Sequence, residues 1–80
     1  RSKAIRRVDL YFDGPADGAV FKPIAGVRDA EVRNHHVSLS FDGSMEELLN
    51  VATSNYTLVD INTQEADLEE IFLTYYREEA

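Results

Sequence analysis

The chain has 80 residues, of which 44% are hydrophobic, and a formal net charge of −7 at pH 7. This length allows one small domain, and the interspersed charges argue against disorder. The absence of cysteine excludes disulfides, and no apolar run approaches the roughly 20 residues that a membrane-spanning helix needs. The negative charge disfavours contact with phosphate backbones, so nucleic acid is not an expected partner.

The first residues, "RSKAIRR", begin with Arg1 and not with Met, so we expect a fragment of a longer protein. We assign residues 1–7 to a linker and residues 8–80 to a single small domain. The basic residues of the linker are expected to be solvated: Arg1, Lys3, Arg6 and Arg7.

The segment "AIRRVDLYF" alternates in hydropathy, with Val8, Leu10 and Phe12 on one side, which predicts a half-buried strand. Turn residues in "DGPADG" end it. The following "ADGAVFK" predicts a short, weak helix, because Gly18 disfavours helix and Pro23 ends it.

A β-hairpin is predicted over "GVRDAEVRNHHVSLSFDG", with its turn near Asn34 and His35, because Asn tolerates a left-handed backbone. The inward positions are Val27, Ala30 and Val32 on the first arm and Val37, Leu39 and Phe41 on the second. His35 and His36 point to opposite faces of a strand and make a poor metal chelate, so we interpret them as polar residues of the turn.

The segment "DGSMEELLNVATSN" predicts a helix with Ser44 as N-cap and Glu47 completing a capping box. Its apolar residues recur at helical spacing: Met45, Leu48, Leu49 and Ala52. The next segment, "YTLVDINTQ", predicts a strand, with Val59 and Ile61 favoured as the inward pair over Tyr56 and Leu58, and with Leu58 partly covered.

A second helix is predicted at the end of the chain, capped by Asp67 with Glu70 at the capping-box position. Its apolar stripe comprises Leu68, Ile71, Phe72, Tyr75 and Tyr76. The first three are expected to pack on the domain's own sheet. The two tyrosines are the candidate partner surface, because a tyrosine can bury its ring and keep its hydroxyl in water.

The order of these elements predicts an α+β domain of ferredoxin-like βαββαβ arrangement. Such a domain packs both helices on one face of a four-stranded antiparallel sheet, and here an extra C-terminal helix is added. RNA-recognition domains share this order. They carry aromatic residues in a basic motif on the exposed sheet face, whereas Ser38 and Ser40 occupy those positions here with nothing basic nearby in the sequence.

Catalytic and cofactor motifs are missing from the sequence: there is no phosphate-binding loop, no dinucleotide fingerprint and no zinc-protease motif. The glutamates Glu69, Glu70, Glu78 and Glu79 are explained as charges on a solvated helix. No catalytic, cofactor-binding or metal-binding residue is predicted.

The end of the chain, "DLEEIFLTYY", resembles the C-terminus of ATP-binding subunits of ABC exporters of the daunorubicin- and antibiotic-resistance type. The residues that carry the resemblance are Leu68, Glu69, Glu70, Ile71, Phe72 and Leu73. "AGVRDAEV" is similar to a turn and strand of the small α+β domain that follows the nucleotide-binding domain in those subunits, although Ala25 stands where proline is common. "HVSLSFDGSMEELLNVA" is similar to its next strand and helix.

This resemblance implies a non-catalytic accessory domain that mediates interdomain or dimer contacts in an ATP-driven exporter. ATP and Mg would be bound by the missing upstream domain, which makes the parent an ABC transporter ATPase. The implied partners are that ATPase domain, a second ATPase subunit and a membrane permease, and the implied location is the cytoplasmic face of the cell membrane. The alternative is an ACT-like small-molecule sensor, because ferredoxin-like sheets also bind amino acids or drugs.

Overall fold

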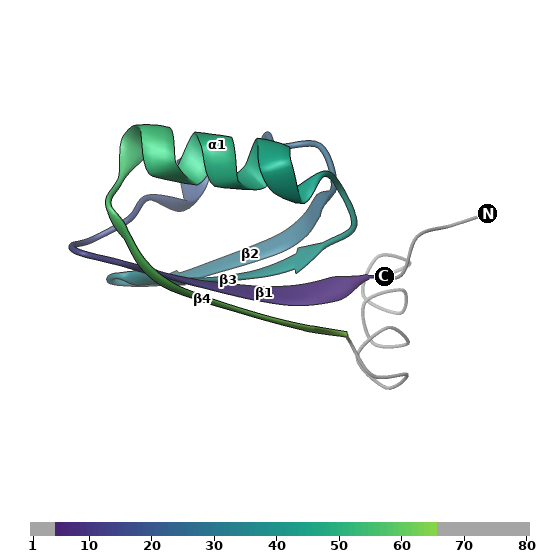
Figure 1. Cartoon of the computed structure of the whole chain (residues 1–80), viewed down its shortest axis with the longest axis horizontal. Coiled ribbons are helices and arrows are strands. Elements are labelled where there is room, and N and C mark those ends of the chain that lie inside the picture. Colours follow the sequence, from purple (N-terminus) through teal and green to yellow (C-terminus); the bar gives the residue numbers. More distant parts are fainter. Residues whose placement is uncertain (1–4, 66–80) are drawn as a thin grey trace.

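The computed structural model describes residues 5–65 of the chain. In chain order the elements are β1 (Arg6–Phe12), the 3-10 helix η1 (Gly18–Val20), β2 (Val27–Arg33), β3 (His36–Phe41), α1 (Met45–Asn55) and β4 (Leu58–Glu65). The strands form one antiparallel sheet in the order β2-β3-β1-β4, and α1 lies across one face of it (Figure 1). The described part is therefore a small α+β domain with a four-stranded antiparallel sheet and one α-helix.

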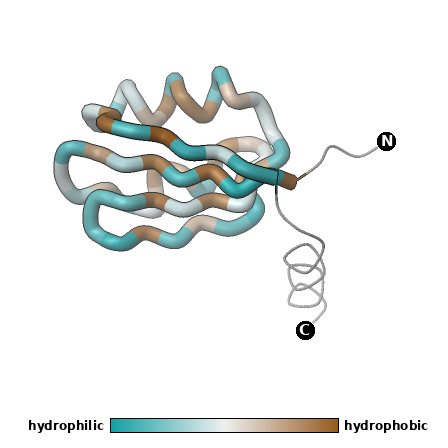
Figure 2. The backbone as a smooth tube through the Cα atoms, turned by 60° about the horizontal axis from the view of Figure 1, so that its bottom comes forward, coloured by the Kyte–Doolittle hydropathy of each residue, from teal (hydrophilic) through white to brown (hydrophobic). Residues whose placement is uncertain are grey.

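The core lies between α1 and the sheet, and alternate residues of the two central strands build it, as the alternation predicted. Hydrophobic and hydrophilic stretches succeed one another along the strands (Figure 2). Helix α1 contributes Leu48 and Ala52, both fully buried. The buried strand residues are Val8, Leu10, Phe12, Val37, Leu39 and Phe41.

The short helix predicted within "ADGAVFK" is instead the single 3-10 turn of η1, which is a correction to the predicted arrangement of two α-helices. The Asp17 side chain accepts a hydrogen bond from the Ala19 N–H at 3.0 Å and begins the turn. Gly18 and Pro23 leave too few residues for an α-helix to propagate. Even so, Phe21 and Ile24 are buried in the core, so the segment covers the sheet without being helical.

The hairpin and the central helix agree with the sequence predictions. Asn34 has the positive φ of 61° that the turn between β2 and β3 requires. The Ser44 hydroxyl accepts a hydrogen bond from the Glu47 N–H at 3.2 Å at the start of α1.

Strand β4 agrees with its predicted orientation at two positions and differs at Val59. Ile61 pairs with the buried Leu10 and so lies on the covered side of the sheet, although it is 37% exposed, and Leu58 is half-buried against the core as expected. Val59, which was predicted to point inward, is 65% exposed. The pairing of β4 with β1 shifts between Tyr11 and Phe12, so Val59 has no partner residue on β1. This bulge breaks the period of two on which the prediction relied.

The two ends of the chain also bear on the predictions. Arg6 and Arg7, which the sequence assigned to the linker, lie in β1 and pair with residues of both β3 and β4. The strand predicted over "AIRRVDLYF" therefore includes both residues. The predicted closing helix, including its cap Asp67, lies outside the described residues.

Candidate functional site

The face of the sheet turned away from α1, here called the open face, is the strongest candidate for a functional surface. Within residues 5–65, α1 and the segment around η1 both lie on the other side. Because neighbouring residues of a strand point to opposite faces, each strand contributes its polar positions to the open face. They are Arg7, Asp9 and Tyr11 of β1, Asp29, Glu31 and Arg33 of β2, His36, Ser38 and Ser40 of β3, and Asp60, Asn62 and Gln64 of β4.

The registers arrange these side chains in rows that cross all four strands. One row runs Arg33, His36, Tyr11 and Asp60, and the next runs Glu31, Ser38, Asp9 and Asn62. Directly opposed residues on one face are close enough for their side chains to interact. The open face is therefore a lattice of polar cross-strand pairs.

The centre of this lattice is the pair formed by Asp9 and His36. The Asp9 Oδ1 lies 2.8 Å from the His36 Nε2, and the two side chains are only 15% and 32% exposed. The His36 ring also stacks on Tyr11, with ring centroids 4.5 Å apart and an angle of 4° between the planes. His36, predicted as a polar residue of the turn, is thus held in place by two neighbours on β1.

Arg7 supplies a second fixed group beside this pair. Its Nε donates a hydrogen bond to the Ser38 Oγ at 3.0 Å. The sequence indicated nothing basic near Ser38, and that inference was wrong. The antiparallel pairing of β1 with β3 places Arg7 opposite Ser40 and within reach of its diagonal neighbour Ser38, which is 31 residues away in the chain.

A hollow of about 280 Å³ opens on this face. It is lined by Arg7, Asp9, Glu31, Arg33, His36 and Ser38. The two residues from β2 form its rim: an Arg33 guanidinium nitrogen lies 3.7 Å from a Glu31 carboxylate oxygen, and their side chains are 80% and 65% exposed. The hollow therefore combines a fixed polar floor with a solvent-exposed pair of opposite charges.

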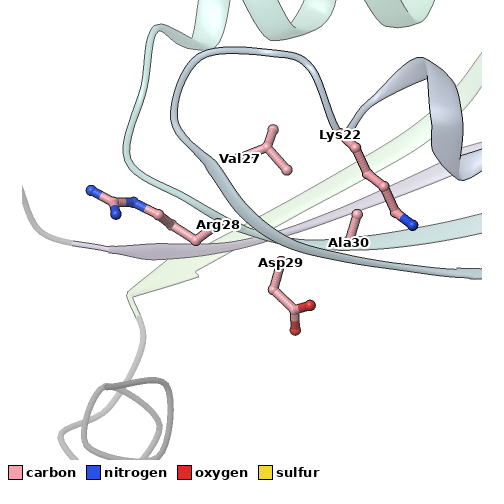
Figure 3. A pocket seen from close by; sticks show the side chains of 5 residues that line it. All are labelled: Lys22, Val27, Arg28, Asp29 and Ala30. Atoms are coloured by element: carbon pink, nitrogen blue, oxygen red, sulfur yellow. The ribbon is translucent and has the colours of Figure 1, made fainter. Parts of the chain in front are cut away.

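Another hollow, of about 270 Å³, lies at the outer edge of the sheet along β2 (Figure 3). Val27 and Ala30 project to one side of the strand and Asp29 to the other, with Lys22 approaching from the preceding segment (Figure 3). Arg28 forms an ion pair with Asp42 at 2.9 Å, which ties β2 to the residue after β3. This contact serves the fold, so the edge hollow is the weaker candidate.

Two kinds of feature are absent from residues 5–65. No group of three or more histidine, cysteine or acidic side chains in this part of the chain is arranged to hold a metal ion. No helix in it has the length and apolarity needed to cross a membrane.

The contact residues proposed from the sequence and the residues that line the hollow are different sets, although Ser38 was expected on the exposed sheet face and does lie there. Tyr75, Tyr76 and the family-motif residues, Leu68, Glu69, Glu70, Ile71, Phe72 and Leu73, lie outside the described residues. The sequence analysis missed the floor and rim of the hollow. The period-two polar positions of β1 and β2 carry a signal for one shared face, but the register that brings them together does not follow from either strand alone.

Comparison of the chain with family models, with curated proteins and with solved structures finds no match. The residues and the geometry of this chain are therefore the basis for its proposed function.

Proposed function

We propose that this chain is a non-catalytic accessory domain of the ATP-binding subunit of an ABC exporter of drugs or antibiotics. The observation that carries the proposal is the resemblance of the segment Leu68–Tyr76 to the end of such subunits. A small α+β domain with one antiparallel sheet is also the architecture expected after their nucleotide-binding domain.

The proposal includes a ferredoxin-like arrangement of the domain. It is supported by the strand order β2-β3-β1-β4, which results when two crossover units interleave in one antiparallel sheet. The departure from that arrangement is η1, which takes the place of the first helix.

In this function the domain mediates contacts and leaves ATP and Mg to an upstream domain. Its proposed partners are that ATPase domain, a second ATPase subunit and the permease, at the cytoplasmic face of the cell membrane. Tyr75 and Tyr76 are the proposed contact residues, since aromatic side chains with a polar end are favoured at protein interfaces.

The first test is the coding sequence upstream of Arg1, which is expected to encode a Walker A loop, an ABC signature and a Walker B acid. If it encodes none of these, the proposal is wrong.

The second test removes residues 8–80 from the parent protein. Dimerisation, ATPase rate and transport are then measured, and a decrease in at least one is expected. The double variant Tyr75→Ala/Tyr76→Ala should reproduce that decrease if these side chains form the contact. Normal values for all three quantities after the deletion would contradict an accessory role.

A second candidate function is small-molecule sensing, and the hollow in the open face is the observation that favours it. This function predicts that a compound exported by the parent raises the melting temperature of the domain. A panel of exported compounds that leaves the melting temperature unchanged would count against it.

A further inference from the structure

We infer that the hollow in the open face binds a small zwitterion, a molecule with an ammonium and a carboxylate group a few ångströms apart. The inference rests on the second candidate function, sensing, and names the class of ligand that this site takes.

The rim of the hollow offers one group of each sign. The guanidinium nitrogen of Arg33 and the carboxylate oxygen of Glu31 are 3.7 Å apart, which is longer than a hydrogen bond. The two charges are therefore close to each other but not hydrogen-bonded. A guanidinium carries five N–H donors and a carboxylate accepts through two oxygens. Both groups therefore keep most of their hydrogen-bonding capacity for a ligand.

The floor of the hollow is already committed to contacts within the protein. Asp9 is held by His36 and Arg7 by Ser38. These contacts fix the floor and leave the rim pair as the groups that recognise a ligand. Because both rim residues belong to a strand paired in the sheet, their backbone positions are more precisely defined than those of loop residues would be.

The charges around the hollow select against ligands of a single sign. Two guanidinium groups, Arg7 and Arg33, face two carboxylates, Asp9 and Glu31. A simple anion placed at Arg33 would also meet the carboxylate of Glu31, and a simple cation at Glu31 would meet the guanidinium. A zwitterion satisfies both groups at once, because each of its ends finds the opposite charge.

The affinity should be weak and sensitive to salt. The rim is exposed, and charges exposed to water interact weakly and are screened by ions. Binding must also overcome the loss of translational freedom of a ligand with few atoms. A millimolar dissociation constant is the expected range.

The test is an NMR titration of the 80-residue chain, labelled with ¹⁵N, with three separate probes at constant ionic strength: glycine, acetate and methylammonium. Glycine should shift the amide resonances of Glu31, Arg33, His36 and Ser38 along one saturable curve. Acetate and methylammonium each carry only one of the two charges. The amide shifts that they cause should not saturate over the same range of concentrations.

Two rim variants and one control sharpen the test. Arg33→Gln and Glu31→Gln should each weaken glycine binding by about tenfold or more, because each removes one charged end of the site. Lys22→Gln removes an exposed cation beside the edge hollow and should leave the affinity unchanged. Retained amide spectra would show that the variants are folded, which is expected because the changed side chains are exposed.

The outcomes separate this inference from the sensing function. If glycine gives no saturable shift, or if acetate alone matches it, the zwitterion inference is wrong. If glycine gives no saturable shift while an exported compound raises the melting temperature, the zwitterion inference is wrong and the sensing function is still supported. If glycine binds as expected but leaves the ATPase rate and transport of the parent unchanged, the site stands and its sensing role falls.

Discussion

The two faces of this sheet are made by the same strands and differ in almost every physical respect. Under α1, the side chains of Val8, Leu10 and Leu39 have almost no contact with water and pack in one apolar layer. On the open face, the residues between them pair through hydrogen bonds and an aromatic stack, as Asp9, His36 and Tyr11 do. The alternation along each strand thus separates an apolar layer that holds the fold together from a surface of polar cross-strand pairs.

The difference has a direct energetic consequence. Burial of apolar surface contributes about 25 cal/mol for each Å² removed from water, whereas exposed ion pairs contribute roughly 0–1 kcal/mol each. Substitutions under α1 should therefore reduce stability strongly, and those on the open face should reduce it little. Four substitutions test this contrast, in order of decreasing effect.

The largest effect is expected for Phe21→Ala. Phe21 lies just after η1, is fully buried, and contacts the rings of Phe12 and Tyr56. Its truncation should lower the free energy of unfolding by about 3–5 kcal/mol, through lost burial and the cavity that remains. Urea denaturation monitored by circular dichroism measures this change.

The variant Phe21→Leu, which fills much of the same space, should lose clearly less stability than Phe21→Ala. If Phe21→Ala left the unfolding midpoint unchanged, the segment around η1 would not cover the sheet as described.

A somewhat smaller effect is expected for Gly26→Ala. Gly26 lies in the loop before β2, which contacts the loop between β3 and α1. Gly26 has a φ of +97°, and a Cβ there would collide with the backbone of Gly43, just before α1. The Asp42 N–H also donates to the Gly26 carbonyl at 2.9 Å across the same contact. We expect a loss of about 2–4 kcal/mol in the free energy of unfolding.

Gly14→Ala is the matched control for this contact. Gly14 also has a positive φ, +144°, but a Cβ there would meet no atom within 4 Å. Its substitution should cost backbone strain alone, about 1–3 kcal/mol, and therefore less than Gly26→Ala, which adds the collision. Equal losses in the two variants, measured by thermal denaturation, would show that the close approach of the two loops contributes nothing.

On the open face, Asp9→Ala tests the partly buried pair that Asp9 forms with His36. Removing the carboxylate eliminates its hydrogen bond with His36 and should lower the free energy of unfolding by about 1 kcal/mol. Loss of the same partner should also shift the NMR resonances of the His36 ring.

The control for this change is Asp29→Ala, on the same face but exposed, for which we expect a change of less than about 0.5 kcal/mol. A loss of about 3 kcal/mol or more for Asp9→Ala, as for a core residue, would contradict the contrast between the faces.

Local patterns predicted much of the covered face and little of the open one. The alternation of Val8, Leu10 and Phe12 and the cap at Ser44 depend on neighbouring residues, so they follow from the sequence. The contact of Arg7 with Ser38 depends on the register between strands far apart in the chain, and no local pattern specifies that register. The floor of the candidate site is made of such contacts, which is why the sequence did not indicate it.

Strand β4 shows the same limit within one element. Its composition predicts a strand, and a strand is present. Its orientation depends on the bulge opposite Tyr11 and Phe12, where Val59 is the additional residue. Composition carries no information about that bulge, and the prediction was therefore wrong at Val59, whereas Ile61 does lie on the covered side, opposite Leu10.

The smallest effect, Val59→Thr, tests that correction directly. Valine and threonine have nearly the same shape, so the substitution mainly adds a hydroxyl group. At a position that is 65% exposed, the hydroxyl stays hydrated, and the free energy of unfolding should change by less than about 0.5 kcal/mol. The same substitution at the fully buried Val37 should cost about 1–3 kcal/mol, because its hydroxyl would lose water without gaining a partner. If urea denaturation showed comparable losses in the free energy of unfolding for the two variants, Val59 would lie in the core. The bulge would then not explain the outward orientation of Val59.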